Sequence, residues 1–178
     1  RSMPRCRPVA PRASRDRPWT LLIAGDGPER ARWQAEARRL GVDARFLGEV
    51  AGIEKRLLLT AADAFALPSR VLPSGRSEGV PVTLLEAMSF GLPIVASAVG
   101  GIIELLPCDG AAGMLVPPDQ SEQLANALER LRLDAGLRAN ICTSARELAE
   151  RHCWSRTIEP ALSVLSALRR HPEISPTP

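Results

Sequence analysis

Short apolar runs alternate with longer amphipathic segments along most of the chain. The run at 19–24 ends in Gly25-Asp26-Gly27-Pro28, a pattern typical of a strand followed by a turn. The segment at 29–40 carries apolar positions at helical spacing and stops at Gly41, which predicts a helix. The same criteria predict further strands at 44–47, 64–67, 93–97 and 113–116, and further helices at about 54–62, 82–90, 121–133, 135–151 and 155–170.

This order of elements predicts the fold class. Short, continuous apolar strands separated by helices indicate a parallel sheet that is covered on both faces. We therefore expect an α/β protein, a Rossmann-like three-layer sandwich with a parallel sheet. Ligands of such sheets bind at the carboxyl ends of the strands, and the Gly-rich loops of this chain follow predicted strands at those ends.

The two ends of the sequence differ from the middle. Residues 1–18 combine arginine and proline with hardly any apolar residue, and 171–178 contain three prolines. Such segments bury too little surface to offset their ordering entropy. We expect disorder at 1–18 and 171–178, and one folded domain at 19–170, since 178 residues suffice for one domain with a core.

Charge and composition exclude several classes of function. Residues 1–17 hold six arginines and one acid, which gives +5, while the other 17 basic and 19 acidic residues give −2, for a net +3. The basicity thus belongs to one terminus, and we expect no nucleic-acid partner. No apolar run approaches the ~18 residues of a membrane span. We expect no signal peptide and, from cysteines without metal-site spacing, no metal centre.

The segment from Glu78 to Glu86 carries the best candidate chemistry. A loop with Gly79 and Pro81 leads directly into the helix predicted from Val82. The free N–H groups of a helix's first turn form an anion site that suits a diphosphate. Glu86, one turn further, could accept hydrogen bonds from ribose hydroxyls, and Glu78 stands on the loop side. Alone, this pair of carboxylates is a weak pattern, and acids near a helix start are common for electrostatic reasons.

The surrounding motifs make the pair specific. Several runs stand in a specific order and spacing: Gly25-Asp26-Gly27-Pro28, Phe46-Leu47-Gly48, 63–69, Glu78-Gly79, 85–88, 91–97, Gly100-Gly101 with Glu104, and 113–118. With these runs, the chain resembles the retaining GT-B glycosyltransferases of family 4, the glycogen-synthase-like group, over about residues 19–169. The loop at 72–81 looks most like that of members that assemble bacterial exopolysaccharides.

The resemblance implies the donor-binding, C-terminal half of a GT-B enzyme, with a nucleoside-diphosphate sugar as donor and a glycan or lipid-linked acceptor bound by an N-terminal domain. It implies retention of configuration, no cofactor and no metal, and a cytoplasmic protein, with a peripheral position at the inner face of the membrane as the alternative. Glu78 would be catalytic and hold the donor sugar. The donor-binding residues would be Glu86 at the ribose, the backbone amides of Val82, Thr83 and Leu84 at the diphosphate, Gly48 and Val50 at the base, and Gly25 and Gly27 beside the nucleotide.

Three departures from the family pattern bear on activity. Pro81 stands where many members have glycine, and proline removes an N–H. The family places a diphosphate-binding Arg and Lys upstream of the strand at 19–24, where this chain has its Arg/Pro segment; Arg5 or Arg12 are weak substitutes. An acceptor-binding domain is not part of the sequence. We therefore expect a fragment that is inactive alone.

Two alternatives stay open at this point: a non-catalytic or degenerate module that binds nucleotides or nucleotide sugars, and a domain related to sugar-nucleotide epimerases. A dinucleotide cofactor is not expected, because Arg30 occupies the last glycine position of that fingerprint. His152 and His171 are expected to be structural. The helix at 155–170 has an apolar face, which we expect to be exposed and to favour self-association.

Overall fold

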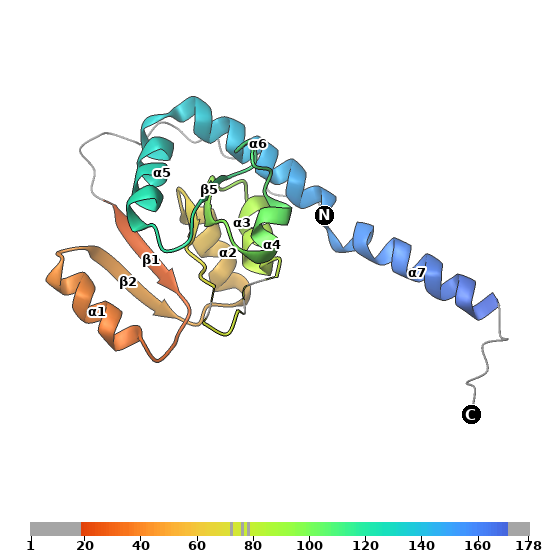
Figure 1. Cartoon of the computed structure of the whole chain (residues 1–178), viewed down its shortest axis with the longest axis horizontal. Helices are drawn as coiled ribbons and strands as arrows, with labels where there is room; N and C mark the ends of the chain where they lie inside the picture. The colour runs from red at the N-terminus through yellow and green to blue at the C-terminus, as the bar shows by residue number, and fades with distance from the viewer. Residues whose placement is uncertain (1–18, 72, 76, 78, 171–178) are drawn as a thin grey trace.

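The computed structural model describes residues 19–71, 73–75, 77 and 79–170. The disorder expected at 1–18 and 171–178 lies outside these residues. The strands are β1 (Thr20–Ala24), β2 (Asp43–Gly48), β3 (Phe65–Leu67), β4 (Ile94–Ser97) and β5 (Met114–Val116). The helices are α1 (Arg30–Arg39), α2 (Gly52–Ala61), α3 (Val82–Ser89), α4 (Gly100–Leu105), α5 (Ser121–Leu133), α6 (Ala135–Arg151) and α7 (Trp154–Arg170) (Figure 1).

The centre of the molecule is a parallel three-stranded sheet in the order β3-β4-β5. All four residues of the middle strand, β4, are buried. Successive side chains of a strand point to opposite faces, and the two faces of β4 belong to two clusters. Ile94 and Ala96 pack with residues of α2, α3 and α4, whereas Val95 packs with residues of α5. Helix α6 contributes to both clusters, which gives three layers.

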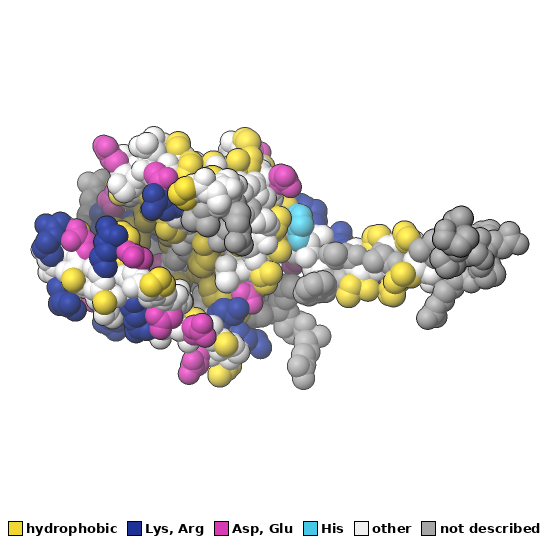
Figure 2. Space-filling model, turned by 60° about the horizontal axis from the view of Figure 1, so that its bottom comes forward, with side chains coloured by type: hydrophobic (Ala, Val, Ile, Leu, Met, Phe, Trp, Pro, Cys, Tyr) yellow, Lys and Arg dark blue, Asp and Glu magenta, His cyan; other side chains and the backbone are white. Residues whose placement is uncertain are grey.

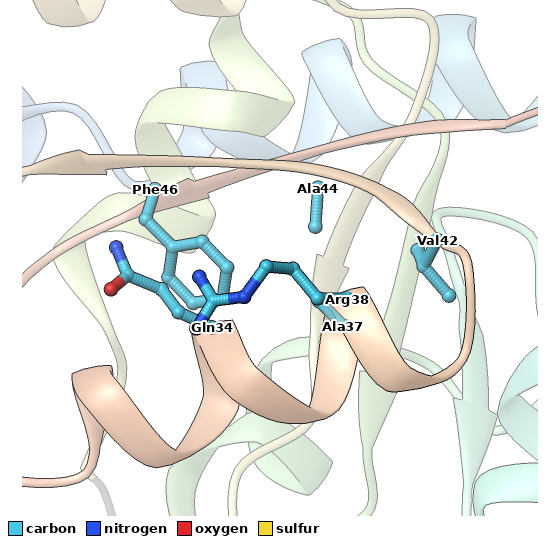
Figure 3. A pocket seen from close by; sticks show the side chains of 6 residues that line it. All are labelled: Gln34, Ala37, Arg38, Val42, Ala44 and Phe46. Carbon is cyan, nitrogen blue, oxygen red and sulfur yellow. The ribbon is translucent and has the colours of Figure 1, made fainter.

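The first two strands form a separate parallel sheet, β1-β2. Ile23 and Phe46 are partners in this register and lie on the same face, and Phe46 points toward α1 (Figure 3). Helix α1 has no buried residue, and Leu21 and Trp33 are 47% and 50% exposed. Within the described residues, no strand pairing joins β1 or β2 to β3. The parallel α/β class is confirmed, but the strands make two sheets rather than one.

Most predicted elements occur within two residues of their expected bounds. Helices α5 and α6 have the predicted bounds. Between them, the Asp134 side chain accepts a hydrogen bond from the Leu137 N–H at 2.8 Å, an N-cap that fixes where α6 begins. Helix α4 was not predicted, because Gly100 and Gly101 at its start are poor helix formers and it is only six residues long.

Helix α7 projects away from the rest of the molecule, beyond the end of α6 (Figure 1). Four of its apolar side chains are between 44% and 58% exposed: Ile158, Leu162, Val164 and Leu165. Figure 2 shows hydrophobic side chains along this projecting arm. The predicted exposure of an apolar face is therefore confirmed, whereas self-association stays a prediction. Among the described helices, none combines the length and apolarity needed to cross a bilayer.

Candidate functional site

The start of α3 presents unsatisfied backbone donors. Pro81 stands before the helix in an extended conformation (φ −69°, ψ 125°). The N–H groups of Val82 and Thr83 donate to no described residue, and both side chains are exposed. The Leu84 N–H already donates to the Pro81 carbonyl at 3.0 Å. Of the three amides predicted to approach a diphosphate, those of Val82 and Thr83 are therefore the ones left available, at the positive end of the helix.

Glu86 lies one turn into α3, as predicted, and its side chain is 34% exposed. Its Oε2 atom is buried and lies 2.8 Å from the Nζ atom of Lys55 in α2. At this distance the two groups form an ion pair, and the Lys55 ammonium partly covers this oxygen. About a third of the Glu86 side chain stays exposed, one turn after the free N–H groups of α3.

The loop before α3 rests on the first turn of α4. A Cβ atom placed on Gly101 would lie 2.6 Å from the carbonyl carbon of Gly79 and 2.8 Å from the Val80 nitrogen. Only glycine allows this approach, because such distances are below any real Cβ contact. The contact joins two motifs that are far apart in the sequence. Glu78, the predicted catalytic residue next to Gly79, lies outside the described residues.

The glycines predicted to border the nucleotide come together at the carboxyl ends of β1 and β2. Gly25 donates its N–H to the Gly48 carbonyl at 2.7 Å, and their φ angles are +120° and +73°. Asp26 accepts hydrogen bonds from the Gly27 N–H at 2.8 Å and from the Arg30 guanidinium at 2.9 Å. The Gly27 bond first, and then Arg30, lowers the pKa of Asp26. The Gly25 bond thus joins the turn that contains Gly25 and Gly27 to Gly48 at the end of β2, and Asp26 ties this turn to α1.

Lys55 was not identified from the sequence, although it is the one lysine beside 22 arginines. After Gly48 the chain passes through Val50, which is half-buried, and enters α2 at Gly52. Lys55 belongs to the first turn of α2, so its ion pair with Glu86 connects the loop that contains Val50 to α3. The presence of one lysine among many arginines was the only sign in the sequence that Lys55 is unusual. It does not indicate that Lys55 pairs with Glu86.

A shallow hollow of about 220 Å³ lies elsewhere, between α1 and β2. In Figure 3, Phe46 and Ala44 point from β2 toward α1, and the side chains of Gln34 and Arg38 lie beside the Phe46 ring. None of the predicted donor-binding residues lines it. It reflects loose packing between α1 and its sheet, since α1 buries no residue.

Comparison with known proteins assigns the family. The family model described as "Glycosyl transferases group 1" matches residues 4–134 of the chain. The chain belongs to this family. Among group 1 relatives, it is 35% identical over 144 residues to D-inositol 3-phosphate glycosyltransferase of Saccharomonospora viridis, covering 79% of the chain and 32% of that protein. It is 36% identical over 150 residues to the putative colanic acid biosynthesis glycosyltransferase WcaL of Escherichia coli, covering 82% and 37%.

Solved structures agree with this membership of group 1. The HepE protein of Anabaena in complex with UDP superposes with a TM-score of 0.72 at 29% identity, over 83% of this chain and 41% of that one. The same protein with UDP-glucose gives a TM-score of 0.71 at 29% identity, over 83% and 41%. The Rossmann-like GT-B fold prediction is thereby confirmed. The chain spans about a third of the length of the curated relatives it matches.

Proposed function

We propose that this chain is the donor-binding part of a retaining group 1 glycosyltransferase that moves a sugar from a nucleoside diphosphate to a glycan or lipid-linked acceptor. The observation that carries the proposal is the position of Glu86. Its side chain is 34% exposed, and it stands one turn beyond two free N–H groups of α3. Vicinal hydroxyls of a ribose are donors whose hydrogen bonds a partly exposed carboxylate at this position could accept.

The first turn of α3 supplies the second half of the argument. A diphosphate placed at the Val82 and Thr83 N–H groups would receive hydrogen bonds and meet the positive end of the helix dipole. Four residues of α-helix span about 6 Å, a distance compatible with a ribose at Glu86 and a diphosphate at Val82. The complexes of Anabaena HepE with UDP and UDP-glucose support a nucleotide-sugar donor for a relative with this fold.

In this proposal Gly48 and Val50 border the base, and Gly25 and Gly27 let the chain pass close to the nucleotide. Glu78 would hold the donor sugar. Catalysis would rest on positioning and on stabilising the leaving diphosphate, without a metal, in the cytoplasm or at the inner face of its membrane. Because the chain spans about a third of its curated relatives, we expect it to bind a donor without transferring sugar by itself.

Calorimetric titration with UDP, GDP and ADP tests the proposal. We expect at least one of them to bind, and Glu86→Ala to lower its affinity at least tenfold, since loss of two hydrogen bonds to a charged acceptor costs about 1.5–3 kcal/mol each. Glu122→Ala, an exposed acid in the first turn of α5, is the matched control and should bind like the wild type.

Two results would contradict the proposal. One is that none of the three nucleotides binds under conditions in which circular dichroism reports a folded chain. The other is an equal loss of affinity in Glu86→Ala and Glu122→Ala, which would indicate an effect of net charge rather than a contact at Glu86.

A further inference from the structure

The ion pair between Lys55 and Glu86 places a cation beside the proposed donor site. The two side chains are 30% and 34% exposed, so the pair is neither deeply buried nor fully solvated. Within the described part of the chain, Glu86 is the one polar partner of the Lys55 ammonium. An ammonium has three donors. At least two of them are therefore free for another acceptor.

The geometry of α3 brings those donors toward the first turn of the helix. Glu86 is four residues after Val82, about 6 Å along the axis. Helical side chains lean toward the N-terminus of their helix, which brings the carboxylate, and the ammonium 2.8 Å from it, closer to the free N–H groups of Val82 and Thr83. An anion at those N–H groups would lie within reach of the flexible Lys55 side chain.

The charge of the Lys55 ammonium would matter to an anion bound at the start of α3. A diphosphate is strongly anionic, and a carboxylate such as Glu86 within a few ångströms would repel it. A cation that contacts both groups offsets this repulsion. An uncharged nucleoside lacks the diphosphate and gains nothing from the cation.

We propose that Lys55 is a donor-binding residue whose ammonium bridges Glu86 and the diphosphate, so that the site selects nucleoside diphosphates over nucleosides. The inference rests on the proposed function, because it assumes that a nucleotide occupies the site at Glu86. It adds a residue and a selectivity that the sequence motifs do not assign.

Calorimetry with UDP and uridine on matched variants measures this selectivity. Lys55→Met keeps an unbranched side chain and removes the charge, whereas Arg56→Met removes the neighbouring, exposed cation of α2. We expect Lys55→Met to lower UDP affinity about 10-fold or more, as for loss of a charge-assisted bond, and to change uridine affinity less than about threefold. Lys55→Arg should retain most of the UDP affinity, and Arg56→Met should leave the ratio of the two affinities unchanged.

The single lysine allows a second measurement on the unaltered protein. Chain produced with ¹³C,¹⁵N-lysine has one lysine ε-methylene resonance, which needs no assignment. We expect UDP to shift this resonance more than uridine does. The shift in the UDP complex should also follow protonation of the terminal phosphate, near pH 6. This readout does not depend on whether Lys55→Met folds.

The outcomes separate the two proposals. Suppose that the wild type binds UDP. If Lys55→Met then lowers the affinities for UDP and uridine equally, or if both ligands shift the lysine resonance equally, the role of Lys55 is overturned and the donor site stands. A rise in UDP affinity in Lys55→Met would also overturn it, since Lys55 would then compete with the ligand. Failure of the wild type to bind UDP, GDP or ADP would overturn the proposed function and this inference together.

Discussion

The two halves of this chain are built from the same elements and packed very differently. In the half around β3-β4-β5, every residue of β4 is buried, and side chains such as Leu84, Met88 and Leu106 are 0% exposed. In the half formed by β1, β2 and α1, the helix buries nothing, and Leu21 is 47% exposed. Both halves contribute residues to the candidate site. The secondary structure of each follows from its sequence, but the stability of the fold rests on the half around β3-β4-β5.

Truncation of one leucine in each half should give the largest contrast. Leu106→Ala removes a fully buried side chain from the main cluster and should lower the free energy of unfolding by about 2–5 kcal/mol. Leu21→Ala removes a half-exposed one and should cost less than about 1 kcal/mol. Urea denaturation followed by circular dichroism measures both. Similar losses of unfolding free energy would mean that β1 is as well packed as the cluster around β4, which would contradict the exposures described above.

Two helix-terminal glycines give a smaller contrast. Gly41 follows α1 and Gly91 follows α3, with φ of +66° and +70°. Alanine at either position should cost about 1–2 kcal/mol from left-handed backbone strain. At Gly41 a Cβ meets nothing within 4 Å, but at Gly91 it would lie 2.5 Å from the Arg146 Nη2 atom. Moving that guanidinium breaks its 3.3 Å bond to the Phe90 carbonyl.

Gly91→Ala should therefore lose about 1 kcal/mol more than Gly41→Ala, the net worth of one hydrogen bond. Thermal and urea unfolding of the pair decide the matter. A greater loss from Gly41→Ala would show that the surroundings of α3 are more adaptable than those of α1.

The smallest expected effect concerns pH, at the point where the halves meet. Hydrogen bonding to Arg132 in α5, and less strongly to the Trp19 side chain beside β1, lowers the pKa of Glu129 from its ordinary value of 4.5. A carboxyl with a lowered folded pKa contributes its full stability above the ordinary value and loses it as pH falls through the folded one. Glu129→Gln should thus reduce the acid sensitivity of the melting temperature below pH 4.5. An unchanged pH profile would contradict this.

Local patterns account for what the sequence predicted correctly. Helices α5 and α6 carry clear helical spacing and an Asp134 cap, so even their bounds were predictable. Helix α4 was hidden by Gly100 and Gly101, and the reason for glycine at 101 is a contact with Gly79 that no local pattern contains. The division into two sheets was equally inaccessible, because strand pairing depends on contacts between distant segments.

The candidate site was predicted in part for the same reason. Motif order located Glu86, the amides of Val82 and Thr83, and the turn of Gly25 and Gly48. It did not reveal that the Leu84 amide is already bonded to Pro81. Nor could it find Lys55, whose partner lies in a different helix.

The hydrogen bond between Gly25 and Gly48 has a consequence for how tightly any ligand can bind. This turn belongs to the half with little buried surface, and regions of that kind open locally at low free energy while the core stays intact. Consider a ligand that contacts both the turn and α3. Its observed association constant equals the intrinsic constant multiplied by the fraction of molecules in which the turn is closed. Whatever holds β1 and β2 in place would then tighten binding without making a single contact to the ligand.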